Sequence, residues 1–160
     1  MTTKGKPVRI LLADDDPDDR ILIEEAFKEA LLSFDQINHL DFVKDGEELM
    51  DYLYRREQYV NSDESLRPDL ILLDLNMPRK DGMEALREIK SDPKLRCISV
   101  IILTTSKADK DIYRSYDLGA NSYIAKPVTF EGLIEVMKTL GKYWLEIVEL
   151  PSEYGKQQHG

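Results

Sequence analysis

The chain has 160 residues, of which 42% are hydrophobic and 33% charged, a composition typical of one folded globular domain. Its formal net charge of −9 disfavours nucleic acid and anionic membrane surfaces as direct partners, because both repel an acidic protein. No apolar run approaches the roughly 20 residues of a membrane span. Residues 1–7, which we expect to be flexible, lack the apolar core of a secretory signal, so we expect a cytoplasmic protein.

Five short apolar runs mark the predicted strands, at residues 8–13, 39–43, 69–75, 99–104 and 122–125. Three of them are nearly continuous Ile, Leu and Val, which is typical of strands buried on both faces of a parallel sheet. Helical patterns follow them, at residues 17–32, 45–56, 82–90, 109–120 and 129–150. This alternation predicts an α/β fold with a doubly wound, five-stranded parallel sheet.

Directly after the first predicted strand, residues 14–19 read "DDDPDD". Adjacent carboxylates repel one another, so the cluster needs an explanation. Asp16 followed by Pro17 is typical of a helix start, with Asp16 as the N-cap and Pro17 at the first helical position. Asp18 and Asp19 then lie beside the positive end of the helix. A helix start explains the last three aspartates and leaves the first two for a functional site.

The same stretch approaches the calcium-binding loop of an EF-hand. Asp14, Asp16 and Asp18 fall at the first three ligand positions and Glu25 at the twelfth. Asp19, however, stands where the loop needs glycine for its sharp turn, and a strand precedes the stretch where an EF-hand has a helix. These departures disfavour calcium binding.

Polar residues also follow three of the other predicted strands. Asp74 comes at the end of the third, Thr104 at the end of the fourth and Lys126 directly after the fifth. In a doubly wound sheet, ligands bind outside the carboxyl ends of the strands, where Asp14 and Asp15 also lie. Carboxylates can hold Mg²⁺ or act as a nucleophile, and a hydroxyl and an ammonium can bind phosphoryl oxygens. The sequence therefore predicts a phosphate-handling site.

In order and spacing, these residues resemble the receiver domain of two-component response regulators. The acidic pair, "DLNMPRKDG" around Asp74, Thr104 and "YIAKP" around Lys126 carry the resemblance, which covers about residues 8–140. It implies a flavodoxin-like topology, with Asp74 as the acceptor of a phosphoryl group from a sensor histidine kinase. It also implies a bound Mg²⁺, for which Mn²⁺ can substitute. The metal ligands would be Asp14, Asp15, Asp74 and the backbone carbonyl of Asn76.

The resemblance implies roles for the remaining site residues. Thr104 would hydrogen-bond the acyl phosphate, and Lys126 would pair first with Asp74 and then with a phosphoryl oxygen. Tyr123 would rotate inward on phosphorylation as part of a switch with Thr104; alternatively, it is a sheet aromatic with its hydroxyl in water. The bond between Lys126 and Pro127 resembles the family's cis peptide, because only X-Pro bonds adopt cis at modest cost.

The last helical pattern continues beyond the length that a receiver needs, giving an extension over about 141–150 before a tail at 151–160. We therefore expect one receiver domain over 8–150. An apolar stripe of this length either folds back on its own domain or forms a homodimer interface. The interface candidates are Phe130, Met137, Trp144, Leu145, Ile147 and Val148.

The "YWLEIVELP" ending, the "ADDDPDD" start and the long loop before Asp74 resemble the small stand-alone response regulators that pair with phytochromes. This resemblance implies a phytochrome-type sensor kinase as partner and output through protein contacts. A pseudo-receiver scaffold and a Mg²⁺-dependent phosphohydrolase are alternatives. The hydrolase would use a D-x-D motif at residues 14–16, but the pattern around Asp74 and the absence of a substrate cap disfavour it. We expect no enzyme activity beyond the protein's own phosphotransfer and dephosphorylation, and we take the single cysteine, Cys97, as structural.

Overall fold

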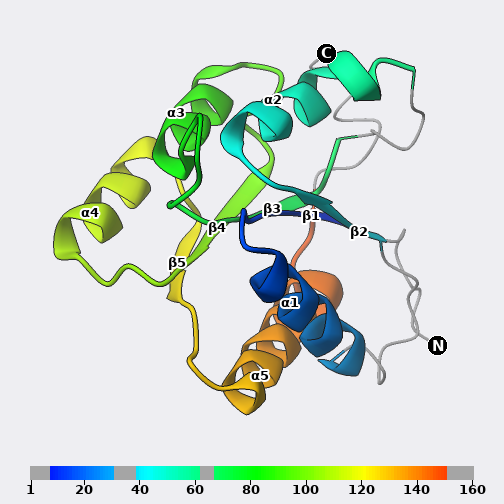
Figure 1. Ribbon diagram of the computed structural model, residues 1–160, viewed down its shortest axis with the longest axis vertical. Coiled ribbons are helices and arrows are strands. Elements are labelled where there is room, and N and C mark those ends of the chain that lie inside the picture. The colour runs from blue at the N-terminus through cyan, green and yellow to red at the C-terminus, as the bar shows by residue number, and fades with distance from the viewer. Residues whose placement is uncertain (1–7, 31–38, 62–66, 151–160) are drawn as a thin grey trace.

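The computed structural model describes residues 8–30, 39–61 and 67–150. Its five parallel strands form one sheet with the order β2-β1-β3-β4-β5, which confirms the predicted doubly wound α/β architecture (Figure 1). Each strand lies within a predicted apolar run. The strands are β1 (Arg9–Ala13), β2 (His39–Val43), β3 (Leu70–Leu73), β4 (Ser99–Thr104) and β5 (Ser122–Ala125).

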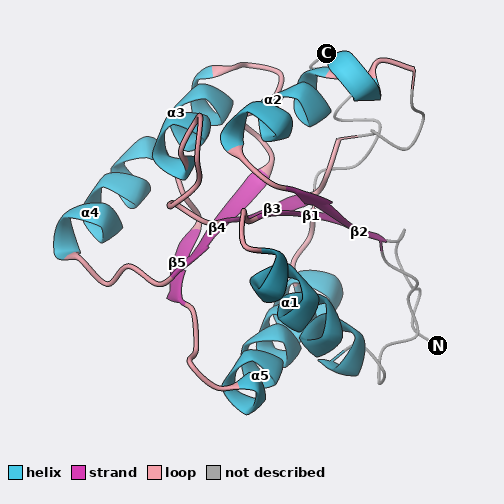
Figure 2. Ribbon diagram, viewed as in Figure 1, coloured by secondary structure: helices cyan, strands magenta, loops and turns pink. Residues whose placement is uncertain are grey.

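Helices cover both faces of the sheet (Figure 2). Two of them, α1 (Pro17–Ala30) and α5 (Phe130–Gly141), lie side by side on one face. The other face carries α2 (Gly46–Tyr54), α3 (Gly82–Ser91) and α4 (Asp109–Leu118). A short 3₁₀ helix, η2 (Glu57–Tyr59), lies at the beginning of the long loop before Asp74. No helix in the described ranges is long and apolar enough to cross a membrane.

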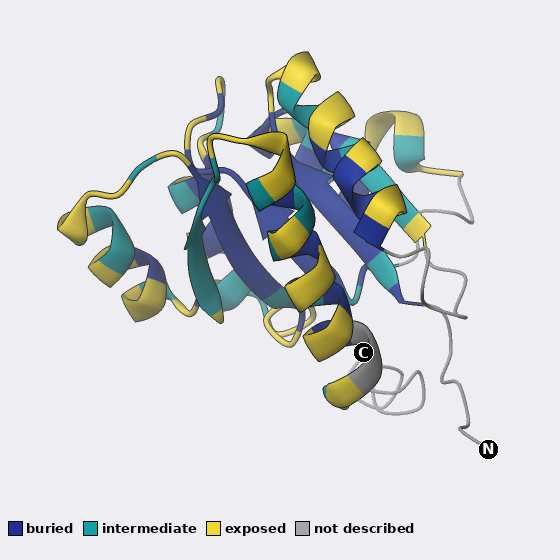
Figure 3. Ribbon diagram, turned by 90° about the horizontal axis from the view of Figure 1, so that it is seen from below, coloured by how far each residue is buried: buried dark blue, intermediate teal, exposed yellow. Residues whose placement is uncertain are grey.

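The three central strands β1, β3 and β4 are buried on both faces, as their apolar runs predict, whereas the edge strands β2 and β5 are mostly half-buried (Figure 3). All four residues of β3 are buried, and they alternate between two core clusters. Ile71 and Leu73 pack in the cluster with α2 and α3, whereas Leu70 and Leu72 pack in the cluster with α1 and α5. Each buried Leu or Ile side chain contributes roughly 1.5–3 kcal/mol, so the central strand anchors both layers.

The C-terminal segment differs from the single long helix that the sequence predicts. The α5 helix ends at Gly141 and continues as a short π-helix, η3 (Lys142–Ile147). The N–H of Val148 donates to the carbonyl of Tyr143 at 2.8 Å, a bond that spans five residues rather than four. The three- and four-residue spacing of the apolar stripe therefore does not continue along one face, and Trp144 turns into the core.

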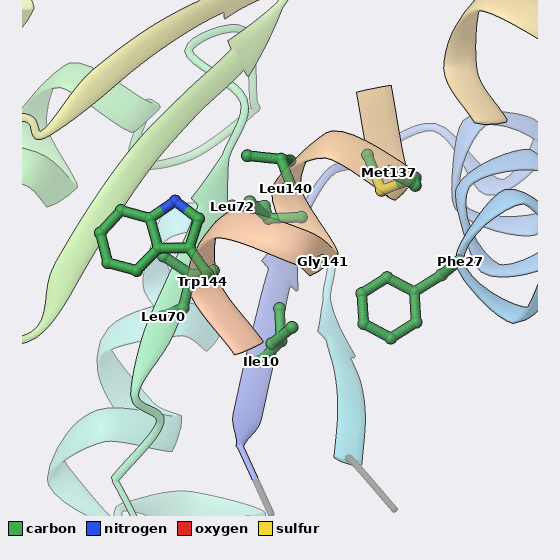
Figure 4. Close-up of a pocket in the computed structure, with 8 residues that line it drawn as sticks. All are labelled: Ile10, Phe27, Leu70, Leu72, Met137, Leu140, Gly141 and Trp144. Atoms are coloured by element: carbon green, nitrogen blue, oxygen red, sulfur yellow. The ribbon is translucent and has the colours of Figure 1, made fainter. Parts of the chain in front are cut away.

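Trp144 closes an apolar cavity beneath η3 (Figure 4). Its side chain is 8% exposed and that of Met137 is 1% exposed, so these two interface candidates pack inside the chain's own core. Phe130 and Ile147 are exposed. Val148 is half-buried, and the side chain of Leu145 lies outside the described part of the chain. The cavity is lined by Ile10, Phe27, Leu70, Leu72, Met137, Leu140, Gly141 and Trp144.

Candidate functional site

The first part of the site lies where β1 passes into α1. The buried Asp14 donates its backbone N–H to the Val43 carbonyl at 3.1 Å, which holds this residue to the neighbouring strand β2. Its Oδ1 accepts the N–H of Asp16 at 3.0 Å, and the Asp16 Oδ1 accepts the N–H of Asp18 at 2.9 Å. Asp16 therefore caps α1, as predicted. Because α1 begins at Pro17, this stretch is helical and does not form an EF-hand loop.

Asp74 occupies the equivalent position after β3. Its backbone N–H donates to the Ala13 carbonyl at 3.0 Å, and its Oδ1 accepts the N–H of Asn76 at 3.1 Å. The return of the loop at Gly82 passes close to the same backbone, since a Cβ at Gly82 would lie 2.2 Å from the Asp74 carbonyl oxygen. The loop and the strand end thus fix the Asp74 carboxylate in one place. The metal contact expected of the Asn76 carbonyl stays a prediction.

The structure brings the three predicted metal-binding carboxylates together. One oxygen from each of Asp14, Asp15 and Asp74 lies within 4.8 Å of the others. Asp15 is exposed, whereas Asp14 and Asp74 are buried. Burial raises the pKa of Asp14, an effect opposed by its hydrogen bond from Lys126. Hard carboxylate oxygens at this spacing fit the preference of Mg²⁺ or Mn²⁺.

Lys126 extends from the end of β5 into the same cluster. Its Nζ lies 2.7 Å from Asp14 Oδ2, 2.8 Å from Asp19 Oδ2 and 3.0 Å from Asp74 Oδ2. Burial favours the neutral amine, but the hydrogen bonds to Asp14 and Asp19 outweigh burial and raise the pKa of Lys126. The ammonium therefore stays charged beside Asp74. No cis peptide bond occurs among the described residues, so the prediction of a cis Lys126–Pro127 bond is wrong; trans is the lower-energy form of an X-Pro bond.

Asp19 is the site residue that the sequence reasoning missed. The residue lies in the first turn of α1, as predicted, but its carboxylate also contacts Lys126. Because α1 begins at Pro17, the helix start alone accounts for the Asp19 charge in the sequence. That local role carries no information about the lysine, which lies 107 residues later in the chain.

Thr104 and Tyr123 are linked through the loop after β4. Thr104 is fully buried, and its Oγ1 lies 3.5 Å from the N–H of Ser106. The Tyr123 hydroxyl donates to the Ser106 carbonyl at 3.0 Å, and the Ser106 hydroxyl donates to Asp111 of α4 at 2.7 Å. Burial raises the pKa of Tyr123, although the Ser106 contact opposes this. The tyrosine hydroxyl is thus bound to protein, which the water-exposed alternative did not anticipate.

Comparison with known proteins agrees with this geometry. Residues 10–138 match the family model described as the response regulator receiver domain. Response regulator Rcp1 from Synechocystis sp. is 39% identical over 153 residues, covering 95% of this chain and 99% of Rcp1. The phosphorylated cyanobacterial phytochrome response regulator RcpA is 43% identical, with a TM-score of 0.82 over 91% of this chain and 99% of that chain. The Mn²⁺-bound form of Rcp1 has a TM-score of 0.81 at 39% identity, over 91% of this chain and 100% of that chain.

Proposed function

Since the chain belongs to the response regulator receiver family, we propose that it accepts a phosphoryl group on Asp74 from a sensor histidine kinase. The observation that carries this proposal is the convergence of Lys126 and the acidic cluster on Asp74. Lys126 Nζ lies 3.0 Å from the Asp74 carboxylate, and the Asp14 and Asp15 oxygens lie within 4.8 Å of it. The proposed acceptor Asp74, the carboxylates of Asp14 and Asp15 and the Lys126 ammonium thus meet at the carboxyl edge of the sheet.

The carboxylates of Asp14, Asp15 and Asp74 would hold Mg²⁺ together with the Asn76 carbonyl. When bound, the ion neutralises the charge that develops on the transferred phosphoryl group. The similar response regulator Rcp1 has a structure in a Mn²⁺-bound form, which supports the same class of ion here.

The transfer itself falls to Asp74. Its carboxylate attacks the phosphorus of the kinase phosphohistidine, so a P–O bond forms as the P–N bond breaks, and the electron pair remains on the imidazole nitrogen. The N–H of Asn76 holds one Asp74 oxygen, at 3.1 Å, and Lys126 lies beside the other. In the product, Lys126 and the Thr104 hydroxyl would hydrogen-bond phosphoryl oxygens. The chain's own residues thus orient the nucleophile and then bind the transferred group.

The contacts of Ser106 support an output route. Through this residue the loop after Thr104 is bound both to Tyr123 and to Asp111 of α4. If the Thr104 hydroxyl moves toward a phosphoryl group, the loop, the Tyr123 hydroxyl bond and the start of α4 are disturbed together. We propose that other proteins recognise the phosphorylated state at the surface formed by the loop after β4, Tyr123 and the start of α4.

We propose that the protein acts as a stand-alone receiver with a phytochrome-type kinase as its partner. Support comes from the match to Rcp1, which covers 95% of this chain and 99% of Rcp1, and from the similarity to RcpA, a phytochrome response regulator. On α1, Ile21 and Leu22 are exposed close in sequence to Asp19, and Val128, two residues after Lys126, is 99% exposed. These apolar side chains offer a kinase a contact surface next to Asp74.

The homodimer stays a prediction with a revised set of contacts. Exposed apolar area on the C-terminal segment lies at Phe130, Tyr143 and Ile147, whereas Met137 and Trp144 pack inward. Ile147→Asp should therefore lower the sedimentation mass of a dimer without unfolding the chain. Exposed Val60, on the opposite side of the sheet, supplies the control as Val60→Asp. Equal monomeric masses for all three proteins would refute the interface.

The experiment for the main proposal measures intact mass after incubation with Mg²⁺ and acetyl phosphate, and separately with a phytochrome-type kinase and ATP. The expected result is one added phosphoryl group, lost on chelation of the metal and absent from Asp74→Asn. Asp81→Asn, which changes an exposed carboxylate in the same loop, should still be modified. No modification by either donor would favour a scaffold, and sustained turnover of a phosphomonoester would favour a hydrolase.

A further inference from the structure

Four carboxylates surround the site, but they do not play equivalent parts. Asp14 and Asp74 contact Lys126 and also belong to the cluster that could hold a metal ion. Asp15 belongs to that cluster without a described contact to the lysine. Asp19 contacts the lysine, at 2.8 Å, and is not among the clustered carboxylates. Of these four carboxylates, Asp19 alone contacts Lys126 without belonging to the cluster that could hold the metal ion.

This difference matters when a divalent ion is bound. The ion and the Lys126 ammonium then compete for the oxygens of Asp14 and Asp74, and like charges at such short range repel strongly in a partly buried site. The lysine side chain is only 8% exposed, so water can do little to hold it. A counter-charge that the metal does not share is needed to keep the ammonium in place.

We propose that Asp19 is a positioning residue that holds Lys126 beside Asp74 while the metal occupies the other carboxylates. The proposal rests on the function proposed above. The three N–H groups of the ammonium now meet Asp14, Asp19 and Asp74. On phosphorylation, the Lys126 N–H that now donates to Asp74 would donate to a phosphoryl oxygen instead. The N–H that donates to Asp19 would keep that hydrogen bond. No proton is transferred; the new P–O bond replaces the P–O bond of acetyl phosphate, and acetate leaves.

Asp18 provides a matched comparison. It lies in the same first turn of α1 and carries the same charge, so it complements the helix terminus equally well. It is exposed, and its side chain has no described contact with Lys126. Asp18→Asn therefore reports the helix-start effect alone, whereas Asp19→Asn reports that effect together with any effect on the lysine.

The first test is independent of phosphorylation. The side-chain ammonium of Lys126 is followed by ¹⁵N NMR while Mg²⁺ is added to the unphosphorylated protein. The signal should persist through the titration in the wild type and in Asp18→Asn, because Asp19 shields the ammonium from exchange with water. In Asp19→Asn the signal should be lost as Mg²⁺ binds. Retention of the signal in Asp19→Asn would overturn the proposal.

The second test measures the rate of Asp74 phosphorylation by acetyl phosphate at saturating Mg²⁺. Asp19→Asn should lose about tenfold, the effect of one charge-assisted hydrogen bond on a transition state, and Asp18→Asn should stay within about twofold. Equal rates for the two variants would refute a role for Asp19 in the transfer. If the wild type itself is not phosphorylated, the proposed function fails, and the NMR titration still decides whether Asp19 holds the lysine.

Discussion

The Asp45 carboxylate and the Arg79 guanidinium form an ion pair, with 3.1 Å between Oδ2 and Nε, that joins the start of α2 to the loop after β3. Asp45 is buried and also caps α2 by accepting the N–H of Glu48 at 2.8 Å. Arg79 has a left-handed backbone with φ 65°, and next to it the Lys80 carbonyl accepts the N–H of Gly46 at 2.9 Å. Two contacts therefore hold in place the loop that begins at Asp74, the proposed phosphoacceptor.

Removal of these side chains should have unequal effects on stability. Asp45→Ala should lower the free energy of unfolding by about 1–2 kcal/mol, because a helix cap is lost. Arg79→Ala should cost less, since its half-exposed guanidinium is screened by water and Asp45 keeps the Glu48 N–H. Urea unfolding measures both, with exposed Arg87→Ala as the control. A larger loss for Arg79→Ala than for Asp45→Ala would contradict this ranking.

Metal binding should stabilise the fold through Asp15. Added Mg²⁺ should raise the free energy of unfolding of the wild type, by about 2.7 kcal/mol at a hundredfold excess over Kd. Asp15→Asn should lose most of this gain while its metal-free stability changes little, because Asp15 is exposed. Asp16→Asn removes a neighbouring charge but keeps a good helix cap, so it should respond to Mg²⁺ nearly as the wild type does. Equal responses from the two variants would exclude Asp15 as a ligand.

Trp144→Ala should destabilise the chain itself. Its indole is buried against α1, α5 and the sheet, so truncation should leave a cavity and cost about 3–5 kcal/mol. Tyr143→Ala alters an adjacent aromatic that is 51% exposed and packs edge-on against Trp144, and it should cost much less. Chemical unfolding and sedimentation are measured together. A lower mass for Trp144→Ala at unchanged stability would place the indole in an interface instead.

Alkaline stability should depend on the hydrogen bond from the Tyr54 hydroxyl to Asp92, 2.6 Å long. Burial and the Asp92 carboxylate raise the pKa of Tyr54 to about 12, from 10.0, whereas the Tyr54 hydrogen bond lowers the pKa of Asp92. The stabilisation is therefore complete between about pH 4 and 10. It is lost as the pH rises from 10 to 12, and also as the pH falls below the usual range of an aspartate.

The difference between wild type and Tyr54→Phe isolates this contribution. The difference in the free energy of unfolding should be about 1 kcal/mol at pH 8, because the contact is partly exposed, and should approach zero near pH 12. Thermal or urea unfolding across this range provides the measurement. A difference that grows above pH 10 would show that the sign of the linkage is wrong.

Much of the fold and site follows from sequence because the signals are local. Short runs such as "LILL" at 70–73, bounded by polar residues, favour a strand buried on both faces of a parallel sheet, and the polar residues that follow such strands then lie at its carboxyl edge. Asp14, Asp15 and Asp74 were placed correctly for this reason. The end of α5 at Gly141 was not predictable, because the change from four- to five-residue hydrogen bonding depends on how Trp144 packs against the sheet. The contact between Asp19 and Lys126 was not predictable either, because the start of α1 already accounts for the charge of Asp19.

The site combines residues from four strands, and its cation comes from β5, the last strand in the chain and an edge of the sheet. A chain still emerging from the ribosome carries Asp74 well before Lys126. If Lys126 is needed for transfer, such a chain offers a kinase an acceptor without its cation.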